Sequence, residues 1–225
     1  MPDANGPARA LILFGPPGSG KGTQAKLLKE CLAVPHIATG DMLRERIQRA
    51  DDLGLMVKHL IDGGDLVPDD LINRMVEDRV VLPDCGQGFI LDGYPRTLSQ
   101  AETICEALRR RGAGLFVVYL KVDYNVIIGR LAGRRNCPDC GAVFNVHSNP
   151  PKSAGVCDAC QSPLQIRDDD RESVVRRRLE AYEVQTRPLL EYFSRDGRSF
   201  VELDGASEAP PVIAQRICEL AGAAR

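Results

Sequence analysis

The chain has 225 residues, of which 44% are hydrophobic and 27% are charged, and its formal net charge is −2. This length suits one core with insertions or two small domains. The small net charge argues against the basic field that proteins binding nucleic acid or anionic membranes carry. The apolar runs are too short to span a bilayer, and residues 1–6 lack the basic and apolar regions of a signal peptide. We therefore expect a cytoplasmic protein that binds neither membrane nor nucleic acid.

A glycine-rich loop follows the first apolar run. Residues 10–14 read as a strand, residues 15–23 are Gly-Pro-Pro-Gly-Ser-Gly-Lys-Gly-Thr, and a helical pattern comes next. This order is typical of a phosphate-binding loop, because glycines let backbone N–H groups converge on an anion and the helix N-terminus adds positive charge. An ordinary turn is the alternative, which the flanking pattern disfavours. The residues expected to hold the phosphates are Gly18, Ser19, Gly20, Lys21, Gly22 and Thr23.

One position departs from the usual loop. Gly22 occupies the place where such loops carry a serine or threonine that binds magnesium, and Thr23 follows it. Direct ligation by that hydroxyl is therefore not expected. Magnesium held mainly through its waters and the substrate phosphates is the alternative, since this ion gives up water reluctantly.

Apolar runs and helical patterns alternate along much of the remaining chain. The runs are residues 89–91, 115–122 and 200–203, and helical patterns cover 98–111 and 125–131. This alternation predicts an α/β fold with a parallel sheet covered by helices, which binds ligands at the carboxyl ends of the strands.

Three other segments have their own patterns. Residues 39–67 are predicted as helices joined at Gly54 and at Gly63–Gly64, and residues 133–170 carry two cysteine pairs with little apolar periodicity. Residues 206–225 are predicted as a loop with two prolines and then a helix.

An acid and several arginines point to phosphate chemistry. Asp92 ends a buried strand and is expected to hold the waters of magnesium, although a simple Asp-Gly turn is the alternative. Arg96, three residues beyond Gly93, favours the functional interpretation. Arginines bind phosphate oxygens with two N–H groups, but they also form salt bridges, and the spacing leaves both open for Arg130, Arg134, Arg167 and Arg178. For Arg135, Arg176 and Arg177 we favour ordinary surface roles.

The cysteines fall into two groups. Cys137 and Cys140 form one Cys-x-x-Cys pair and Cys157 and Cys160 form another, with sixteen residues between the pairs. This spacing predicts a structural zinc site, because four thiolates complete the tetrahedron. Disulfides or thiols without metal are the alternatives, and His147 is a weaker candidate ligand. Four scattered cysteines are assigned no role and are expected to be buried thiols, namely Cys31, Cys85, Cys105 and Cys218.

Taken together, these motifs resemble the adenylate kinase family in its bacterial form with a long, zinc-bearing lid. The resemblance covers nearly the whole chain. It rests on residues 15–23, 38–44 (Ala-Thr-Gly-Asp-Met-Leu-Arg), 64–69 (Gly-Asp-Leu-Val-Pro-Asp), 91–97 (Leu-Asp-Gly-Tyr-Pro-Arg-Thr), 133–135, 149–152 and 167–170. It implies a core P-loop domain over 1–37, 68–132 and 171–225, an AMP-binding insert over 38–67 and a zinc-binding lid over 133–170, both inserts being mobile.

The resemblance also implies an activity and its residues. The chain would transfer the terminal phosphoryl group of ATP to AMP reversibly, giving two ADP, with Mg²⁺ accompanying ATP and structural Zn²⁺ in the lid. The implied catalytic residues are Lys21, Asp92, Arg96, Arg134, Arg167 and Arg178. AMP would contact Thr39, Arg44, Asp65, Leu66, Val67, Gly93, Tyr94, Pro95, Arg96, Gln100, Arg167 and Arg178. Gln100 would read the adenine edge.

The same resemblance extends to the donor nucleotide. Beyond the glycine-rich loop, ATP would contact Arg130, Arg134, Val143, Phe144 and Ser207. Asp169 and Asp170 would pair with lid arginines. The family implies a monomer whose partners are the nucleotides ATP, AMP and ADP.

Other functions are weighed against this one. Within the same class of kinase, the alternatives are a different nucleoside monophosphate as acceptor or GTP as donor. A P-loop switch is disfavoured because the sequence has no Asn-Lys pair for a guanine reader. A zinc-ribbon nucleic-acid module is disfavoured because the cysteine segment lacks a basic surface.

Overall fold

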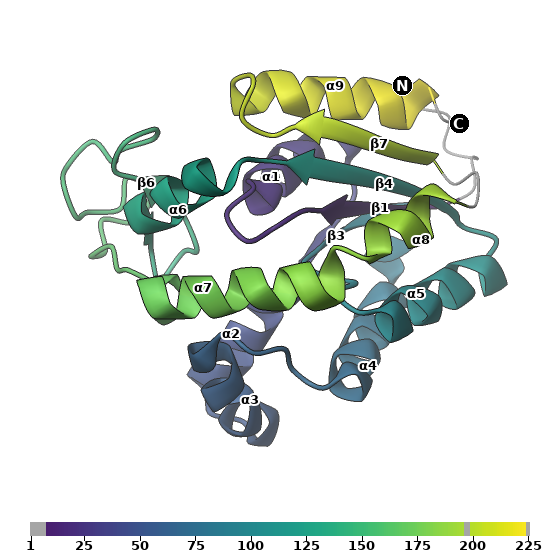
Figure 1. Ribbon diagram of the computed structural model, residues 1–225, viewed down its shortest axis with the longest axis horizontal. Helices are drawn as coiled ribbons and strands as arrows, with labels where there is room; N and C mark the ends of the chain where they lie inside the picture. Colours follow the sequence, from purple (N-terminus) through teal and green to yellow (C-terminus); the bar gives the residue numbers. More distant parts are fainter. Residues whose placement is uncertain (1–7, 196–198, 224–225) are drawn as a thin grey trace.

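The computed structural model of the chain describes residues 8–195 and 199–223, so the predictions on residues 1–6 and Arg225 lie outside it. The described residues build a central parallel sheet of five strands in the order β2-β3-β1-β4-β7 (Figure 1). These are β1 (Arg9–Phe14), β2 (His36–Ala38), β3 (Gly88–Asp92), β4 (Gly114–Lys121) and β7 (Ser199–Asp204). The α/β class with a parallel sheet is confirmed.

Strand register brings two predicted sequences to one edge of the sheet. β1 pairs with β3 so that Leu13 lies opposite Asp92, and the glycine-rich loop leaves β1 directly after Phe14. Because all the strands are parallel, their carboxyl ends meet at this edge. β2 was not predicted, since its three residues, His-Ile-Ala, are too few to show a pattern.

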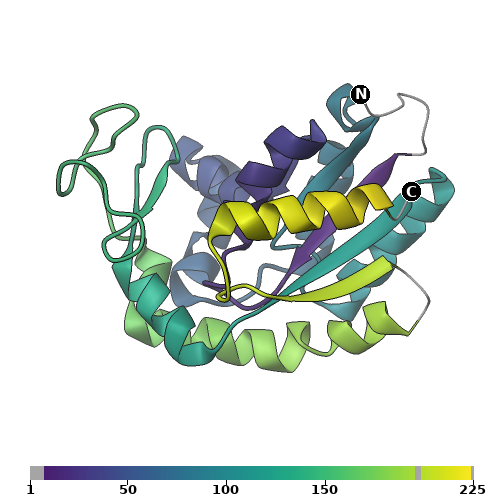
Figure 2. The same ribbon diagram turned by 90° about the horizontal axis from the view of Figure 1, so that it is seen from above.

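Helices cover both faces of the sheet, as Figures 1 and 2 show. The side chains of Leu11 and Leu13 pack on one face against α1 (Lys21–Leu32) and α9 (Pro210–Ala223). Ala10, Ile12 and Phe14 point to the other face, where the core includes α4 (Asp69–Val80), α5 (Leu98–Arg110) and α8 (Leu189–Ser194). Successive side chains of β1 therefore alternate between two hydrophobic cores, one on each face of the sheet.

The remaining helical elements connect these layers. They are α6 (Tyr124–Gly133), α7 (Glu172–Ala181), short 3₁₀ turns at Pro83–Cys85 and Asp168–Asp170, and a π-helical turn at Tyr182–Thr186. The two prolines expected in a loop instead begin α9, where a missing N–H costs no helical hydrogen bond. Within the described residues, no helix combines the length and the hydropathy needed to cross a membrane.

The segment 39–67 forms two helices, as predicted, but the predicted joint at Gly54 is wrong. α2 (Thr39–Arg49) ends at Ala50, and α3 (Asp52–Gly63) begins after Asp51, whose side chain accepts a hydrogen bond from the Gly54 N–H at 2.8 Å. A Cβ at Gly54 would lie 2.3 Å from the carbonyl oxygen of Arg46. The glycine therefore permits close packing of α3 on α2 rather than a break.

The cysteine segment lies beyond α6, at the end of the sheet where the strands finish (Figures 1 and 2). It contains a small antiparallel pair, β5 (Arg134–Asn136) and β6 (Val143–Asn145), and otherwise consists of turns. Lys26 of α1 reaches it, donating a hydrogen bond of 3.1 Å to the carbonyl oxygen of Gly141. The segment thus contacts the helix that follows the glycine-rich loop.

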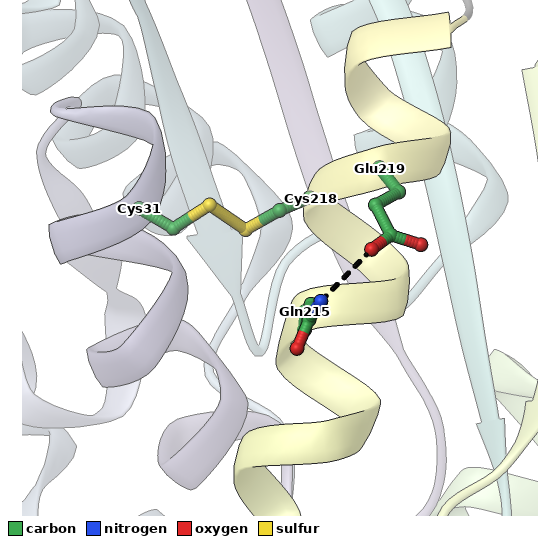
Figure 3. Close-up of a disulfide and its surroundings, with 4 residues drawn as sticks. All are labelled: Cys31, Gln215, Cys218 and Glu219. Atoms are coloured by element: carbon green, nitrogen blue, oxygen red, sulfur yellow. Dashed lines mark hydrogen bonds between the residues drawn. A yellow bond between two sulfur atoms is a disulfide. The ribbon is translucent and has the colours of Figure 1, made fainter.

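Two of the scattered cysteines are not thiols. Cys31, in the last turn of α1, forms a disulfide with Cys218 of α9, and their Cα atoms are 6.6 Å apart (Figure 3). The expectation of buried thiols is therefore wrong for this pair, because the two helices pack side by side and bring distant parts of the chain together. Cys85 is a buried thiol, as expected, whereas Cys105 is a thiol that is only half-buried.

Candidate functional site

A single large cavity of about 1190 Å³ opens at the carboxyl ends of the strands. It is lined by the glycine-rich loop, by α2 and the residues after α3, and by the cysteine segment. All the predicted nucleotide-binding residues line it except Ser207. The Ser207 hydroxyl instead donates a hydrogen bond of 3.1 Å to the carbonyl oxygen of Asp204, while Gly205 and Glu208 line the cavity.

The glycine-rich loop wraps around the ammonium group of Lys21. Its Nζ donates to the carbonyl oxygens of Gly15 at 2.8 Å and Pro16 at 2.9 Å. Burial lowers the pKa of Lys21 to about 8, an effect that the carboxylate of Asp92 opposes and nearby arginines reinforce. The loop needs glycine at Gly18 and Gly20, whose φ angles are 80° and 100°. Lys21 is thus a half-buried amino group that two carbonyl oxygens hold at the floor of the cavity.

Asp92 faces the start of α1 from the end of β3. Its Oδ2 lies 3.4 Å from Nε2 of His36 and would lie 3.3 Å from a Cβ at position 22. A serine or threonine at Gly22 would therefore crowd the carboxylate, which accounts for the departure from the usual loop. A carboxylate beside a phosphate-binding loop suits Mg²⁺, a hard cation that prefers oxygen ligands and keeps several waters. The residues present fit that ion.

Five guanidinium groups gather across the middle of the cavity wall, those of Arg44, Arg96, Arg134, Arg167 and Arg178. Burial lowers the pKa of Arg96 to about 10, and the neighbouring Arg178 adds to the effect. Burial also lowers the pKa of Arg167 to about 10, with Arg44 and Arg134 contributing. Like charges held this closely repel one another, so the cluster favours a polyanion between its members.

Acidic residues partly neutralise this cluster. Asp170 accepts two hydrogen bonds from Arg134, that from Nε being 2.6 Å long. Asp169 lies 3.0 Å from Nη1 of Arg178 and 4.0 Å from Nη1 of Arg44. The expectation of lid partners is wrong for Asp169, because Arg178 belongs to α7 and Arg44 to α2.

Other arginines have the surface roles that were favoured. Arg176 forms an exposed ion pair with Glu172 four residues earlier, and Arg135 donates to the carbonyl oxygen of Ala132 at 3.1 Å. Arg130 is different, since it lines the cavity and donates to the carbonyl oxygens of Ser19 at 3.3 Å and Gly205 at 2.9 Å.

The opposite end of the cavity is a polar pocket between α2, α4 and α5. Thr39 donates to the carbonyl oxygen of Gly93 at 3.0 Å. Oε1 of Gln100 accepts from the backbone N–H of Arg96 at 2.8 Å, and its Nε2 donates to Oδ1 of Asp69 at 2.7 Å. Residues 65–67 also line this end.

The four predicted zinc cysteines lie together. The sulfur atoms of Cys137, Cys140, Cys157 and Cys160 all lie within 4.8 Å of one another. The Cys137–Cys160 sulfur distance is 3.3 Å and the Cys140–Cys157 distance is 3.5 Å. Tetrahedral Zn–S bonds of about 2.3 Å place sulfur atoms about 3.8 Å apart, so small adjustments let this cluster accept zinc.

Comparison with known proteins agrees with the geometry. The family model described as "Adenylate kinase" matches residues 13–198. The chain belongs to the adenylate kinase family. The adenylate kinase of Thermosipho melanesiensis is 47% identical over 204 residues, which cover 90% of this chain and 95% of the relative. The enzymes of Methanocella arvoryzae and Moorella thermoacetica are also 47% identical, over 91% and 90% of this chain and 94% of each relative. The resemblance seen in the motifs is confirmed, and the chain is an enzyme of this family.

Several cavity residues were missed by the sequence reasoning. His36 lies beside Asp92, Asn145 of the cysteine segment donates to the carbonyl oxygen of Arg130 at 2.9 Å, and Thr186 donates to that of Arg96 at 2.9 Å. Asp69, which lies behind the cavity lining, was quoted only as part of a motif, although it accepts a hydrogen bond from Gln100. The position of His36 could have been inferred from the sequence, because it lies three residues before Thr39, which was predicted to contact the nucleotide. Thr186 offered none, because it comes from a distant part of the chain.

Proposed function

We propose that the chain catalyses the reversible transfer of the terminal phosphoryl group of ATP to AMP, giving two ADP. Family membership supports this reaction. The observation that carries it is the single cavity, which joins a phosphate-binding loop at one end to a polar pocket at the other through the arginine cluster. Two nucleotides meeting phosphate to phosphate would fill such a site.

ATP would occupy the end formed by the glycine-rich loop. Backbone N–H groups of residues 18–23 and the positive end of α1 would bind its phosphates, with Lys21 as a point charge. The side chains of Arg130, Val143 and Phe144 line the same end and would hold the base and ribose. Ser207 lies just outside the lining, so a contact there would have to come from its main chain.

AMP would occupy the opposite pocket. It is lined by Thr39, Arg44, residues 65–67, Gly93, Tyr94, Pro95, Arg96 and Gln100, and the backbone of residues 65–67 would contact the nucleotide. Arg44 and Arg96 would bind the monophosphate, since a planar guanidinium matches a phosphate with two parallel N–H groups. Gln100 would contact the base.

Transfer would then need alignment and charge stabilisation rather than a covalent intermediate. Lys21, Arg96, Arg134, Arg167 and Arg178 would surround the transferring group. A hydrogen bond to a charged group contributes about 1.5–3 kcal/mol, so several that strengthen together at the transition state would lower the barrier by many powers of ten. Asp92 would hold the waters of Mg²⁺, which when bound neutralises phosphate charge.

Water competes with AMP as acceptor, so the site has to exclude it before transfer. The segments 38–67 and 133–170, as an AMP-binding insert and a lid, would close over the core formed by 1–37, 68–132 and 171–225. Zinc held by the four cysteines would keep the lid one rigid body. We also propose that the protein acts as a cytoplasmic monomer in adenine nucleotide balance.

The test is a coupled assay of ADP formation from ATP, Mg²⁺ and AMP, with two arginine variants. Arg96→Lys keeps the charge but loses the planar guanidinium, which can donate two parallel hydrogen bonds to a phosphate. The kcat/KM of this variant for AMP should therefore fall at least about a hundredfold. Arg109→Lys is the matched control, because Arg109 is exposed and pairs only with Glu106 among the contacts described. Absence of ADP formation by the wild-type chain would falsify the proposal.

Two further measurements decide between neighbouring functions. A panel of nucleoside monophosphates with ATP or GTP as donor tests the substrate pair. Filter binding to DNA and RNA at low salt tests the nucleic-acid alternative, and the small net charge predicts no retention.

A further inference from the structure

The side chain of Gln100 is held in one orientation by two partners of opposite kind. Gln100 is only 2% exposed, and it lies at the wall of the polar pocket. Its Oε1 accepts from the backbone N–H of Arg96 at 2.8 Å, while its Nε2 donates to Oδ1 of Asp69 at 2.7 Å. An ionised carboxylate can only accept and a backbone N–H can only donate. If the amide turned over, its oxygen would face the carboxylate of Asp69 and its NH₂ group would face the N–H of Arg96, and neither pair could form a hydrogen bond.

Asp69 is itself fixed. It begins α4, and its second carboxylate oxygen accepts a hydrogen bond of 2.6 Å from the hydroxyl of Thr97. Thr97 in turn caps α5, accepting from the backbone N–H of Gln100 at 3.3 Å. The carboxylate therefore links the starts of two helices, and it cannot rotate away from Gln100 without losing both hydrogen bonds.

The orientation leaves a defined pattern for a ligand. A glutamine amide offers two N–H donors and two lone pairs, and its two protein partners use one of each. One donor and one acceptor remain, the donor on the Asp69 side and the acceptor on the Arg96 side. A base that presents an amino group next to a ring nitrogen acceptor complements this pair.

We propose that Asp69 is a specificity-determining positioning residue, which fixes the amide of Gln100 so that the acceptor pocket selects 6-aminopurine over 6-oxopurine monophosphates. This rests on the proposed function, in which the pocket binds AMP. A 6-oxopurine presents an acceptor and an adjacent N–H donor, the reverse of the pattern that the fixed amide can pair. Asp69 does not line the cavity, so it acts through Gln100 rather than by touching the base.

The test compares AMP with inosine monophosphate, which differs in having an oxo group at position 6 and a proton on N1. In Asp69→Asn the partner of Gln100 can either donate or accept, so only the backbone N–H of Arg96 still opposes the turned-over amide. The orientation that pairs with the oxo base therefore becomes more accessible. The ratio of kcat/KM for AMP to that for inosine monophosphate should fall at least about tenfold, mainly through KM for the two acceptors, while KM for ATP stays within about twofold. Asp69→Glu keeps an acceptor-only carboxylate and should restore much of the ratio.

Asp70→Asn is the matched control, because it removes the same charge from an exposed neighbour in the same helical turn. Its ratio should stay within about twofold of the wild type. A ratio in Asp69→Asn that equals that of Asp70→Asn would overturn the inference. Calorimetric titration with each monophosphate gives the same ratio as binding constants, so the outcome is independent of turnover.

A measurement on the wild type covers the case in which Asp69→Asn does not fold. In ¹⁵N-edited spectra, one side-chain amide proton of Gln100 should be shifted downfield by the carboxylate, and AMP should move mainly the other proton. Inosine monophosphate at equal concentration should not produce that shift. If AMP moves neither proton, the inference fails. Failure of the proposed function is distinct, since it would appear as a wild-type chain that forms no ADP.

Discussion

Arg178 of α7 and Asp169 form an ion pair of 3.0 Å between Nη1 and Oδ2, and the same nitrogen donates to the carbonyl oxygen of Asp169 at 2.8 Å. The two side chains are only 17% and 10% exposed. Arg44 of α2 approaches the same carboxylate at 4.0 Å. Asp169 therefore contacts Arg178 of α7 and faces Arg44 of α2, and both arginines line the cavity.

The first prediction concerns Asp169→Asn. Removing the charge leaves Arg178 with the more distant carboxylate of Asp170, 3.4 Å from Nη1, so at neutral pH the free energy of unfolding should fall by about 2 kcal/mol. Burial raises the pKa of Asp169, but Arg178, Arg44 and other arginines outweigh it and hold the pKa below its usual value. The contribution is therefore complete above about pH 4 and is lost as pH falls through the native pKa.

Urea unfolding at several pH values checks this. The difference between wild type and Asp169→Asn should be constant from about pH 7 to pH 5 and should shrink at lower pH. Asp168→Asn is the control, because Asp168 is 62% exposed and pairs with Arg171 at the surface. A difference that does not change with acidity would contradict the ion-pair explanation.

The second prediction concerns protons taken up with ATP. Burial lowers the pKa of Lys21 to about 8, so part of the population is neutral at and above that pH. Phosphates beside the ammonium group favour its charged form and raise the pKa. Binding of ATP near about pH 8.5 should therefore take up a large fraction of one proton, and near about pH 6.5 this lysine should contribute almost none.

Calorimetry in buffers of different ionisation enthalpy measures that uptake directly. Lys21→Met should bind ATP more weakly, but at sufficient protein concentration its proton uptake near the higher pH should be close to zero. Equal uptake by the variant and the wild type would assign the proton to another group.

The third prediction concerns removal of zinc. The buried hydrophobic side chains of the cysteine segment form only a small cluster, Cys137, Phe144 and Cys157, so metal binding would supply much of its stability. Chelation should lower the midpoint of thermal unfolding far more than it lowers kcat at low temperature. Calorimetric scans, zinc content and activity before and after dialysis against a chelator test this, with added zinc restoring the midpoint. An equal loss of turnover in a chain that remains folded would mean that zinc does more than hold structure.

The local motifs could be predicted from the sequence because each places its chemistry within a few residues. The glycine-rich loop needs backbone angles that only glycine adopts readily, and Asp92 ends a strand of buried apolar residues. Parallel strands then meet at one edge, so the sequence indicated that these two lie together. The spacing of the four cysteines in the sequence was itself enough to predict that their sulfur atoms lie together.

Features that depend on long-range packing could not be predicted. β2 has three residues, and it is a strand only because β3 lies beside it. Gly54 looked like a break, yet it lies where two helices touch. Asp69 and Gln100 are far apart in sequence, and nothing in either segment indicates that their side chains meet. The pairing of Cys31 with Cys218 depends in the same way on two helices packing together.

That disulfide gives the fourth prediction. It joins residues 187 apart in sequence, so it restricts the unfolded chain strongly, and disulfides of this kind contribute about 2–4 kcal/mol. Reduction should lower the free energy of unfolding by that amount. Activity at room temperature should change little, because α1 and α9 also pack through Leu28, Ile213 and Ile217, and Gln24 donates to the carbonyl oxygen of Pro210 at 3.1 Å.

Urea unfolding with and without a reductant, in excess zinc to protect the cluster of four cysteines, measures the loss. The Cys31→Ser/Cys218→Ser variant is the control, since it should unfold like the reduced wild type and should not respond to reductant. Mass spectrometry after alkylation without reduction should find both cysteines unmodified in the wild type. A reductant effect of equal size in the double variant would trace the stability to another pair of cysteines, because no Cys31–Cys218 bond remains there to break.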